Sequence, residues 1–288
     1  MSRADATLAL SGANVGFVSG LTWLPSDLLG ELAVHAGLAA DGETLGATAA
    51  SLRVDLAFVD GGGGFAKDAV ATLHAADIAA IWCVDGVFGR VAADVGWAEA
   101  LRMTAAEPGA LAARLDEALH EALVTVRAAF DASADAVLVA DDLAGPIGPL
   151  LSPDFALDAL VPCYHRLALE SAASGLPALF HSDGEIRALM PALARAGFSA
   201  VHLAGLDRDG FAAAAGSARR AGLVVLGGVA ASALPEGARA AGERAASVAA
   251  ALGGVIVCDD GGLMTFTQLT SFSAALDAAR DAYRQARS

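Results

Sequence analysis

The feature that most constrains the fold of this chain is a regular alternation of short apolar runs with longer helical segments. Eight such runs, rich in β-branched residues and mostly ending in Gly or Asp, cover residues 15–18, 56–59, 78–84, 136–139, 178–180, 200–203, 223–226 and 255–257. Strands that alternate with helices pair in parallel, because parallel neighbours need a crossover connection. Near-continuous apolar strands are buried on both faces.

These eight units, with a closing helix at 272–287, predict a single (β/α)₈ TIM barrel over residues 1–288. An open, doubly wound sheet is the alternative. The barrel is favoured because no G-x-G-x-x-G motif opens the first helix. The connections after the first, third and fourth runs are long, which suggests extra helices or lids over one end of the barrel.

Polar residues gather where the apolar runs end, and in this fold the active site lies at the carboxyl ends of the strands. In chain order they are Ser19 and Trp23, Asp60, Asp85, Asp141 and Asp142, His181, Ser182 and Asp183, Asp207, and Asp259 and Asp260. A rim of carboxylates raises the pKa of some of its members or recruits a cation. Each Asp could instead cap the helix that follows it, but a histidine at a strand end faces the pocket, so His181 is the strongest candidate.

Two further features have an ordinary interpretation that we prefer. The glycine run 61–64 lacks the Lys and Ser/Thr of a phosphate-binding P-loop and is more typical of a loop at the barrel mouth. Cys258 lies at a strand end and could be a ligand, but buried free cysteines more often behave as small apolar residues.

The charge of the chain limits its partners. The formal net charge is −15, and Lys67 is the single lysine. Such a surface repels phosphate backbones, so nucleic-acid binding is not expected. Runs of about 18 uncharged apolar residues, as in membrane spans, are absent from the sequence, and so is a signal peptide at residues 1–5. We expect a cytoplasmic enzyme with a small-molecule substrate; its oligomeric state stays open, a homodimer being one option.

Residues 134–153 read ADAVLVADDLAGPIGPLLSP, and two later blocks read FHSDG and LGGV. These motifs resemble the uroporphyrinogen decarboxylase superfamily, whose members are (β/α)₈ barrels. The superfamily includes true uroporphyrinogen decarboxylases and cobamide-dependent methyltransferases. The resemblance is strong over the middle third, extends to 253–276 and is loose over the first 130 residues. The motifs imply the fold without selecting the reaction. We expect the segment 148–153 to form an ordered loop over the pocket, because Pro149 and Pro153 restrict it.

The methyltransferase branch binds zinc through His-x-Cys and a later Cys, and the zinc makes an acceptor thiol nucleophilic. By this resemblance His181 matches the histidine, Asp183 the first cysteine, and Asp260, or less well Cys258, the second. A His/Asp/Asp set can hold Zn or another divalent ion. The alternative is that Asp183 bonds to His181 or caps a helix, with no metal present.

The decarboxylase branch fits less well. Its arginine-bearing R-Q-A-G-R block, which holds the substrate carboxylates, has no counterpart in residues 12–27. A substrate with eight carboxylates also suits an aspartate-rimmed pocket poorly. Asp60 falls in the region of the catalytic aspartate of that branch.

Three hypotheses follow. The first is a methyltransferase-type enzyme for a small methylated or acidic substrate, with a corrinoid protein as partner. In it, His181, Asp183 and Asp260 hold a metal or act as acid and base. The residues expected to contact or orient the substrate are Asp141, Asp142, Tyr164, Trp23 and Ser19. The second is a cofactor-free decarboxylase in which Asp60 or Asp141 protonates a carbanion-like centre. The third is a non-catalytic component of a corrinoid system.

Overall fold

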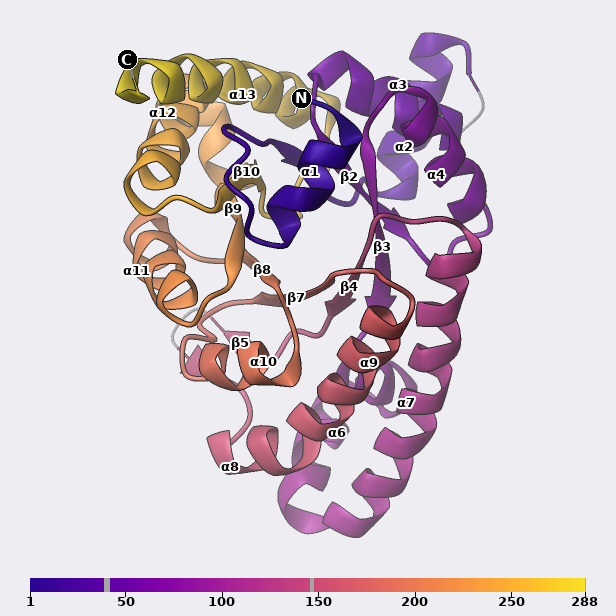
Figure 1. Ribbon diagram of the computed structural model, residues 1–288. Helices are drawn as coiled ribbons and strands as arrows, with labels where there is room; N and C mark the ends of the chain where they lie inside the picture. The colour runs from indigo at the N-terminus through magenta and orange to yellow at the C-terminus, as the bar shows by residue number, and fades with distance from the viewer. Residues whose placement is uncertain (39–41, 146–147, 288) are drawn as a thin grey trace.

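The computed structural model describes residues 1–38, 42–145 and 148–287, and it confirms the predicted (β/α)₈ barrel (Figure 1). The barrel sheet has eight parallel strands in the order β1, β2, β3, β4, β7, β8, β9 and β10. Their bounds are Gly20–Leu21, Leu56–Asp60, Ala79–Asp85, Ala136–Ala140, Ala178–Asp183, Ala200–Ala204, Val224–Val229 and Val255–Asp259. A parallel bridge between Ser19 and Val257 joins the first strand to the last and closes the ring.

The prediction for the first strand was wrong. The apolar run 15–18 precedes the strand, and β1 is the short segment Gly20–Leu21. Val18 packs instead with Leu10 of helix α1 (Arg3–Leu10) in the cluster that fills the barrel interior. In Figure 1, α1 lies across the barrel in front of the strands. The run is therefore apolar because, with α1, it covers the amino-terminal end of the barrel.

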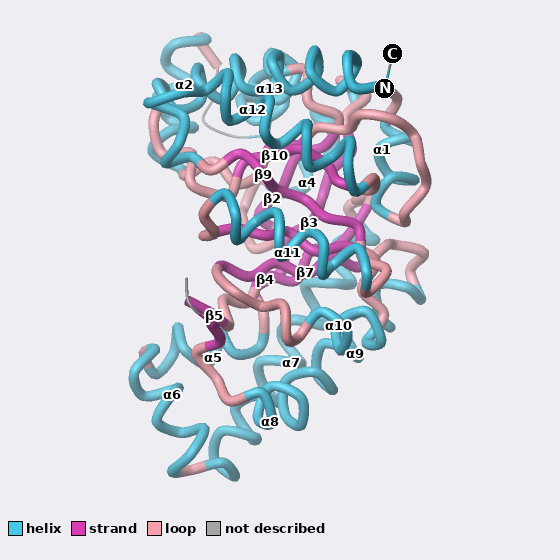
Figure 2. Tube along the Cα trace, turned by 90° about the vertical axis from the view of Figure 1, so that its left-hand side faces the viewer, coloured by secondary structure: helices cyan, strands magenta, loops and turns pink. Residues whose placement is uncertain are grey.

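Helices surround the strands on the outside, as the tube in Figure 2 shows. They are α2 (Ser26–Ala36), α3 (Gly42–Leu52), α4 (Ala66–Ala75), α5 (Val87–Val95), α6 (Trp97–Ala106), α7 (Pro108–Asp131), α9 (Val161–Ala173), α10 (Met190–Ala196), α11 (Arg208–Arg220), α12 (Leu234–Leu252) and α13 (Phe266–Arg287). The long connections hold extra elements. Two helices, α2 and α3, follow β1, where a simple barrel has one. Helices α5 and α6 follow β3 before α7. After β4 come a hairpin of β5 (Ala144–Gly145) and β6 (Gly148–Pro149) and the short helix α8 (Pro153–Phe155).

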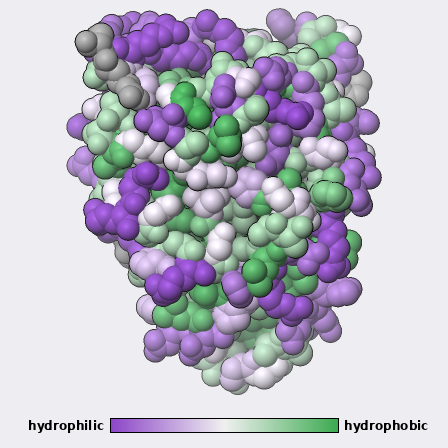
Figure 3. Space-filling view, in the orientation of Figure 1, coloured by the Kyte–Doolittle hydropathy of each residue, from purple (hydrophilic) through white to green (hydrophobic). Residues whose placement is uncertain are grey.

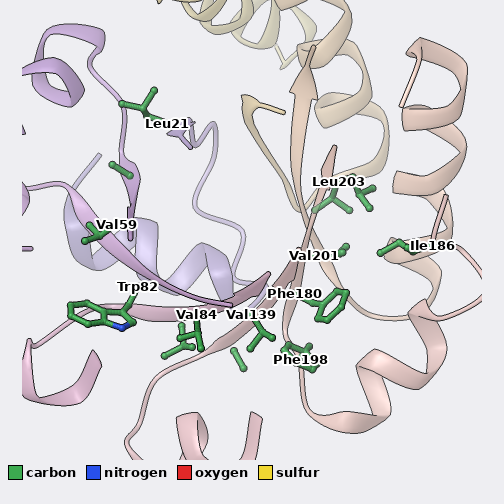
Figure 4. Packing of buried hydrophobic residues seen from close by; sticks show 14 of the residues in the cluster. Leu21, Val59, Trp82, Val84, Val139, Phe180, Ile186, Phe198, Val201 and Leu203 are labelled. Carbon is green, nitrogen blue, oxygen red and sulfur yellow. The ribbon is translucent and has the colours of Figure 1, made fainter. Parts of the chain in front are cut away.

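Two apolar layers result from the alternation of side chains along each strand. Phe180, Val201 and Leu203 point outward into the shell between strands and helices (Figure 4), while Leu179 points into the barrel. The same alternation turns His181 and His202 inward, one layer above Leu179. It thereby places two imidazoles inside the barrel near its carboxyl end.

Hydrophilic side chains are spread over the face of the molecule that Figure 3 shows. Figure 3 shows purple, hydrophilic side chains across this face, interspersed with smaller green areas. None of the helices in the described ranges is long and apolar enough to cross a membrane.

Candidate functional site

A cleft of about 1000 Å³ opens at the carboxyl ends of the barrel strands. His181 lies at its base, and Trp23, Asp60 and Asp142 are among the residues that line it. The strand ends therefore bring together four of the residues that the sequence singled out, as the barrel fold predicts.

His181 is the centre of a group of three side chains that could hold a metal ion. Its Nε2 lies 3.5 Å from Asp142 Oδ1 and 3.8 Å from Asp183 Oδ1. One ligand atom from each residue lies within 4.8 Å of the others. The backbone N–H of Asp183 donates a 2.9 Å hydrogen bond to Asp142 Oδ1, which fixes the two carboxylates relative to each other. Asp142, expected to contact substrate, thus occupies the third position of the predicted metal set.

Asp260 is not part of this group. Its Oδ1 accepts a 3.0 Å hydrogen bond from the backbone N–H of Ala231, so the carboxylate turns toward the segment after β9. Its charge still reaches the site. Burial raises the pKa of Asp183 to about 6, and the charges of Asp142 and Asp260 act in the same direction. A carboxyl group with this pKa is poised to exchange a proton or to be neutralised by a cation.

A second histidine, His202, belongs to the site and was not among the residues predicted from the sequence. His202 on β8 is paired in register with His181 on β7, and the two Nδ1 atoms lie 2.8 Å apart. The Nε2 of His202 lies 3.0 Å from the backbone oxygen of Asp259. Both rings are buried, which lowers the pKa of His181 to about 4 and that of His202 to about 3. Both imidazoles are therefore neutral near pH 7.

Trp23 lines the cleft beside the imidazoles. Its ring meets His181 edge to face with centroids 4.9 Å apart, and it meets Phe58 in the same way at 5.0 Å. These contacts hold the imidazole of His181 from the side, and they leave its Nε2 turned toward the two carboxylates.

Asp141 and Tyr164 lie away from the cleft, inside the protein. Asp141 accepts hydrogen bonds from the backbone N–H groups of Phe88 and Gly89, at 2.9 and 2.7 Å. The hydroxyl of Tyr164 donates a third, at 2.7 Å. Asp141 is 1% exposed, so a substrate cannot reach it. Its carboxylate binds the first turn of α5, the helix after β3, rather than the helix that follows its own strand. Asp141 and Tyr164 therefore do not join the proposed site.

Asp60 and Cys258 differ in their access to the cleft. Asp60 is exposed there, and its Oδ1 accepts a 3.0 Å hydrogen bond from the N–H of Gly62. The glycine run thus turns back at the mouth of the barrel, as expected. Cys258 is fully buried in the barrel interior, and burial raises the pKa of its thiol well above the usual range. A thiol in that state is a poor metal ligand.

Ser19 lies at the opposite end of the barrel. Its hydroxyl donates to Asp55 at 3.1 Å and accepts from Arg280 at 3.2 Å, and Asp55 directly precedes β2. The misplaced first strand explains this difference, because Ser19 comes before the strand rather than after it.

The segment 148–153 lies at the same end of the barrel as His181. Gly148 and Pro149 pair with β5, and the backbone oxygen of Gly145 in β5 accepts a 3.0 Å hydrogen bond from the backbone N–H of Glu185, two residues after Asp183. Ser152 then caps α8. The segment thus lies at the end of the barrel that the prediction required, but none of its residues is among those that line the cleft, so its position over the pocket stays a prediction.

Comparisons with known proteins agree with this architecture. A methyltransferase from Methanosarcina mazei superposes with a TM-score of 0.71 over 98% of both chains, at 16% sequence identity. D-Psicose 3-epimerase from Clostridium cellulolyticum H10 gives a TM-score of 0.58 over 85% of this chain and 94% of its own, at 12% identity. At these identities the likeness concerns the fold. No curated protein matches the sequence.

The family assignment comes from the sequence itself. The family model for uroporphyrinogen decarboxylase (URO-D) matches residues 86–282, which begin directly after β3 and include β4 to β10. This range holds His181, His202 and all three residues of the candidate metal group. Because the match spans well over half of the 288 residues, the chain belongs to the uroporphyrinogen decarboxylase family.

Proposed function

We propose that the chain is a methyltransferase-type member of its family, which acts on a small substrate at a divalent metal site formed by Asp142, His181 and Asp183. A corrinoid protein would be its methyl-carrying partner, as in the methyltransferases that the sequence resembles. The observation that carries the proposal is the position of the His181 Nε2. It lies at the base of the cleft and faces two carboxylate oxygens at 3.5 and 3.8 Å, longer than normal hydrogen bonds.

The three residues fit zinc. Imidazole nitrogen and carboxylate oxygen are ordinary zinc ligands at about 2.0–2.2 Å, so two ligands at a tetrahedral angle lie about 3.3 Å apart. The separation of 3.5 Å between His181 and Asp142 is close to this value, and Asp183 needs only a small side-chain movement. Three protein ligands leave a fourth position for a substrate atom, the pattern of catalytic zinc sites. When bound, the ion would lower the pKa of a thiol or water in that position.

The charges around the cleft limit which charge a substrate can carry. Among the residues that the structure describes, the lining includes the carboxylates Asp60, Asp85, Asp94, Glu121 and Asp142, against the single arginine Arg90. Arg90 lies 3.9 Å from Asp85 and 3.4 Å from Glu121, so its charge is already paired. An anionic substrate would enter against this field. Of the methylated and acidic substrates considered from the sequence, we therefore favour a neutral or cationic methylated one.

The decarboxylase alternative retains one supporting observation, the exposure of Asp60 in the cleft. Asp141 no longer supports it because that carboxyl group is buried. A decarboxylase also needs a carboxylate substrate, which the lining charges disfavour.

The experiment is metal analysis followed by a transfer assay. The full chain, purified without chelator, should hold about one zinc per chain, and added zinc should raise its Tm. It should then transfer the methyl group of methanol or a methylamine to cob(I)alamin, which forms methylcobalamin, and a chelator should abolish the transfer. Asp209→Ala, which removes an exposed carboxylate on α11 outside the cleft, is the matched control and should keep both properties. Protein that binds no zinc and whose Tm is unchanged by it would refute the metal site.

A further inference from the structure

The donor and acceptor in the hydrogen bonds of His202 can be assigned, because one of its two partners is a backbone carbonyl. The Nε2 of His202 lies 3.0 Å from the oxygen of Asp259, and a carbonyl oxygen can only accept. The proton of neutral His202 is therefore on Nε2. Its Nδ1 is left with a bare lone pair and can only act as an acceptor.

The assignment for His202 also determines which nitrogen of His181 carries a proton. Two nitrogens 2.8 Å apart must share a proton, since two facing lone pairs would repel each other. Because the Nδ1 of His202 accepts, the Nδ1 of His181 donates. A neutral imidazole carries one N–H, so the Nε2 of His181 has no proton. That nitrogen is the one that faces Asp142 and Asp183.

We propose that His202 is a positioning residue that fixes the tautomer of His181 and so keeps the Nε2 lone pair of His181 available to a ligand. The pair is held rigidly, because His202 is fully buried, its ring lies 26° from parallel with that of His181, and Phe58 packs edge-on against it at 5.3 Å. The tautomer follows from these contacts between two neutral imidazoles; that the ligand is a metal ion rests on the proposed function.

The first test reads the tautomer directly in metal-free protein near pH 7. ¹⁵N NMR of the histidine-labelled full chain should show a protonated Nδ1 and a bare Nε2 for His181, and the reverse for His202. The signals are assigned by their loss in His181→Gln and His202→Gln. A proton on the Nε2 of His181, alone or with one on Nδ1, would overturn the proposal whether or not zinc binds.

The second test measures zinc affinity in variants. His202→Leu cannot accept from His181 and should weaken zinc binding about 10- to 100-fold, as loss of such a supporting partner does. His202→Gln offers an acceptor and a donor on one amide and should restore most of the affinity. Ile81→Val, a small buried change in the interior of the barrel, should leave it unchanged.

The outcomes separate this inference from the proposed function. Wild-type chain that binds no zinc, yet shows the expected NMR pattern, would refute the metal site and keep the tautomer assignment. Zinc binding by His202→Leu at wild-type affinity would refute the role of His202. If His202→Leu does not fold, a folded His202→Gln that loses affinity by the full 10- to 100-fold would refute it as well.

Discussion

The hydroxyl of Tyr164 and the carboxylate of Asp141 are joined by a 2.7 Å hydrogen bond in the interior, behind the cleft. The bond completes a set of three donors to Asp141, the other two being backbone N–H groups at the start of α5. This carboxylate thus ties α9, which carries Tyr164, to α5 across the end of β4. Its role is to hold the shell of helices together at the carboxyl end of the barrel.

Asp141→Ala should consequently reduce stability. The change leaves two buried backbone N–H groups and a buried phenol without an acceptor. Each group that stays fully unsatisfied lowers the free energy of unfolding by about 1–3 kcal/mol. Partial relaxation should bring the total to about 2–4 kcal/mol, measured by urea unfolding. Tyr164→Phe removes one donor only and should cost about 1 kcal/mol. A folded Asp141→Ala that keeps its stability but loses activity would return Asp141 to the active site.

Asp183→Ala should abolish activity and leave stability nearly unchanged. The side chain is 54% exposed and lies near two other carboxylates, so its loss should change the free energy of unfolding by less than about 1 kcal/mol. Zinc binding and methyl transfer should be abolished, because one of three ligands is gone. Zinc titration and urea unfolding measure the two effects separately. Full activity in this variant would show that the carboxylate has no part in the chemistry.

The pH dependence of stability should reveal the buried carboxyl of Asp259. Burial raises its pKa to about 6 against the hydrogen bonds from Thr22 and Gly261 that lower it. The unfolded value is about 3.9, so between about pH 4 and 6 the folded state binds more protons than the unfolded state. The stability contributed by this group is therefore present below pH 4 and lost as the pH rises to 6.

The comparison with Asp259→Asn isolates this effect, since other titrating groups are common to both proteins. The unfolding free energy of the wild type, relative to the variant, should fall by about 2–3 kcal/mol between pH 4 and pH 7. Chemical denaturation at several pH values measures it. A difference that stays constant, or rises with pH, would contradict the raised pKa.

Ser19→Ala should lower stability and spare the site. The hydroxyl bonds Asp55 and Arg280 at the amino-terminal end of the barrel, and removing it leaves both with one partner fewer. We expect a loss of about 1–2 kcal/mol in urea unfolding. Zinc affinity should stay at the wild-type value. Reduced zinc affinity at unchanged stability would show that the residue acts on the site after all.

The barrel was predictable from sequence because burial on both faces leaves a strong signal, and seven of the eight apolar runs coincide with barrel strands. The first run failed because apolar composition reports burial and not pairing. Residues 15–18 are apolar where they cover the end of the barrel, whereas β1 is a two-residue strand containing Gly20. An added Cβ at Gly20 would lie 2.5 Å from the end of the Leu56 side chain on β2. The glycine thus favours close packing against β2, and it removes an apolar side chain that would have marked the strand in the sequence.

The site was predictable to the level of strand ends and no further. His181, Asp183, Asp142, Asp60 and Trp23 gather in the cleft region because parallel strands finish at one end of the barrel. The local direction of each carboxylate depends on backbone donors far away in sequence, such as Ala231 for Asp260 and Phe88 for Asp141. His202 was missed because it interrupts an apolar run. Its position, paired in register with His181, was the signal that could have revealed it.

The acceptor that orients His202 is a main-chain oxygen, the carbonyl of Asp259, and not a side chain. A substitution changes a side chain, but it does not delete a main-chain oxygen. The direction of the hydrogen bonds between the two imidazoles is therefore set by the position of the β10 backbone. Evolution could then exchange the groups that face the imidazole of His181, a thiolate for a carboxylate, and alter which ions or substrates are accepted. The nitrogen that receives them would be inherited unchanged with the barrel.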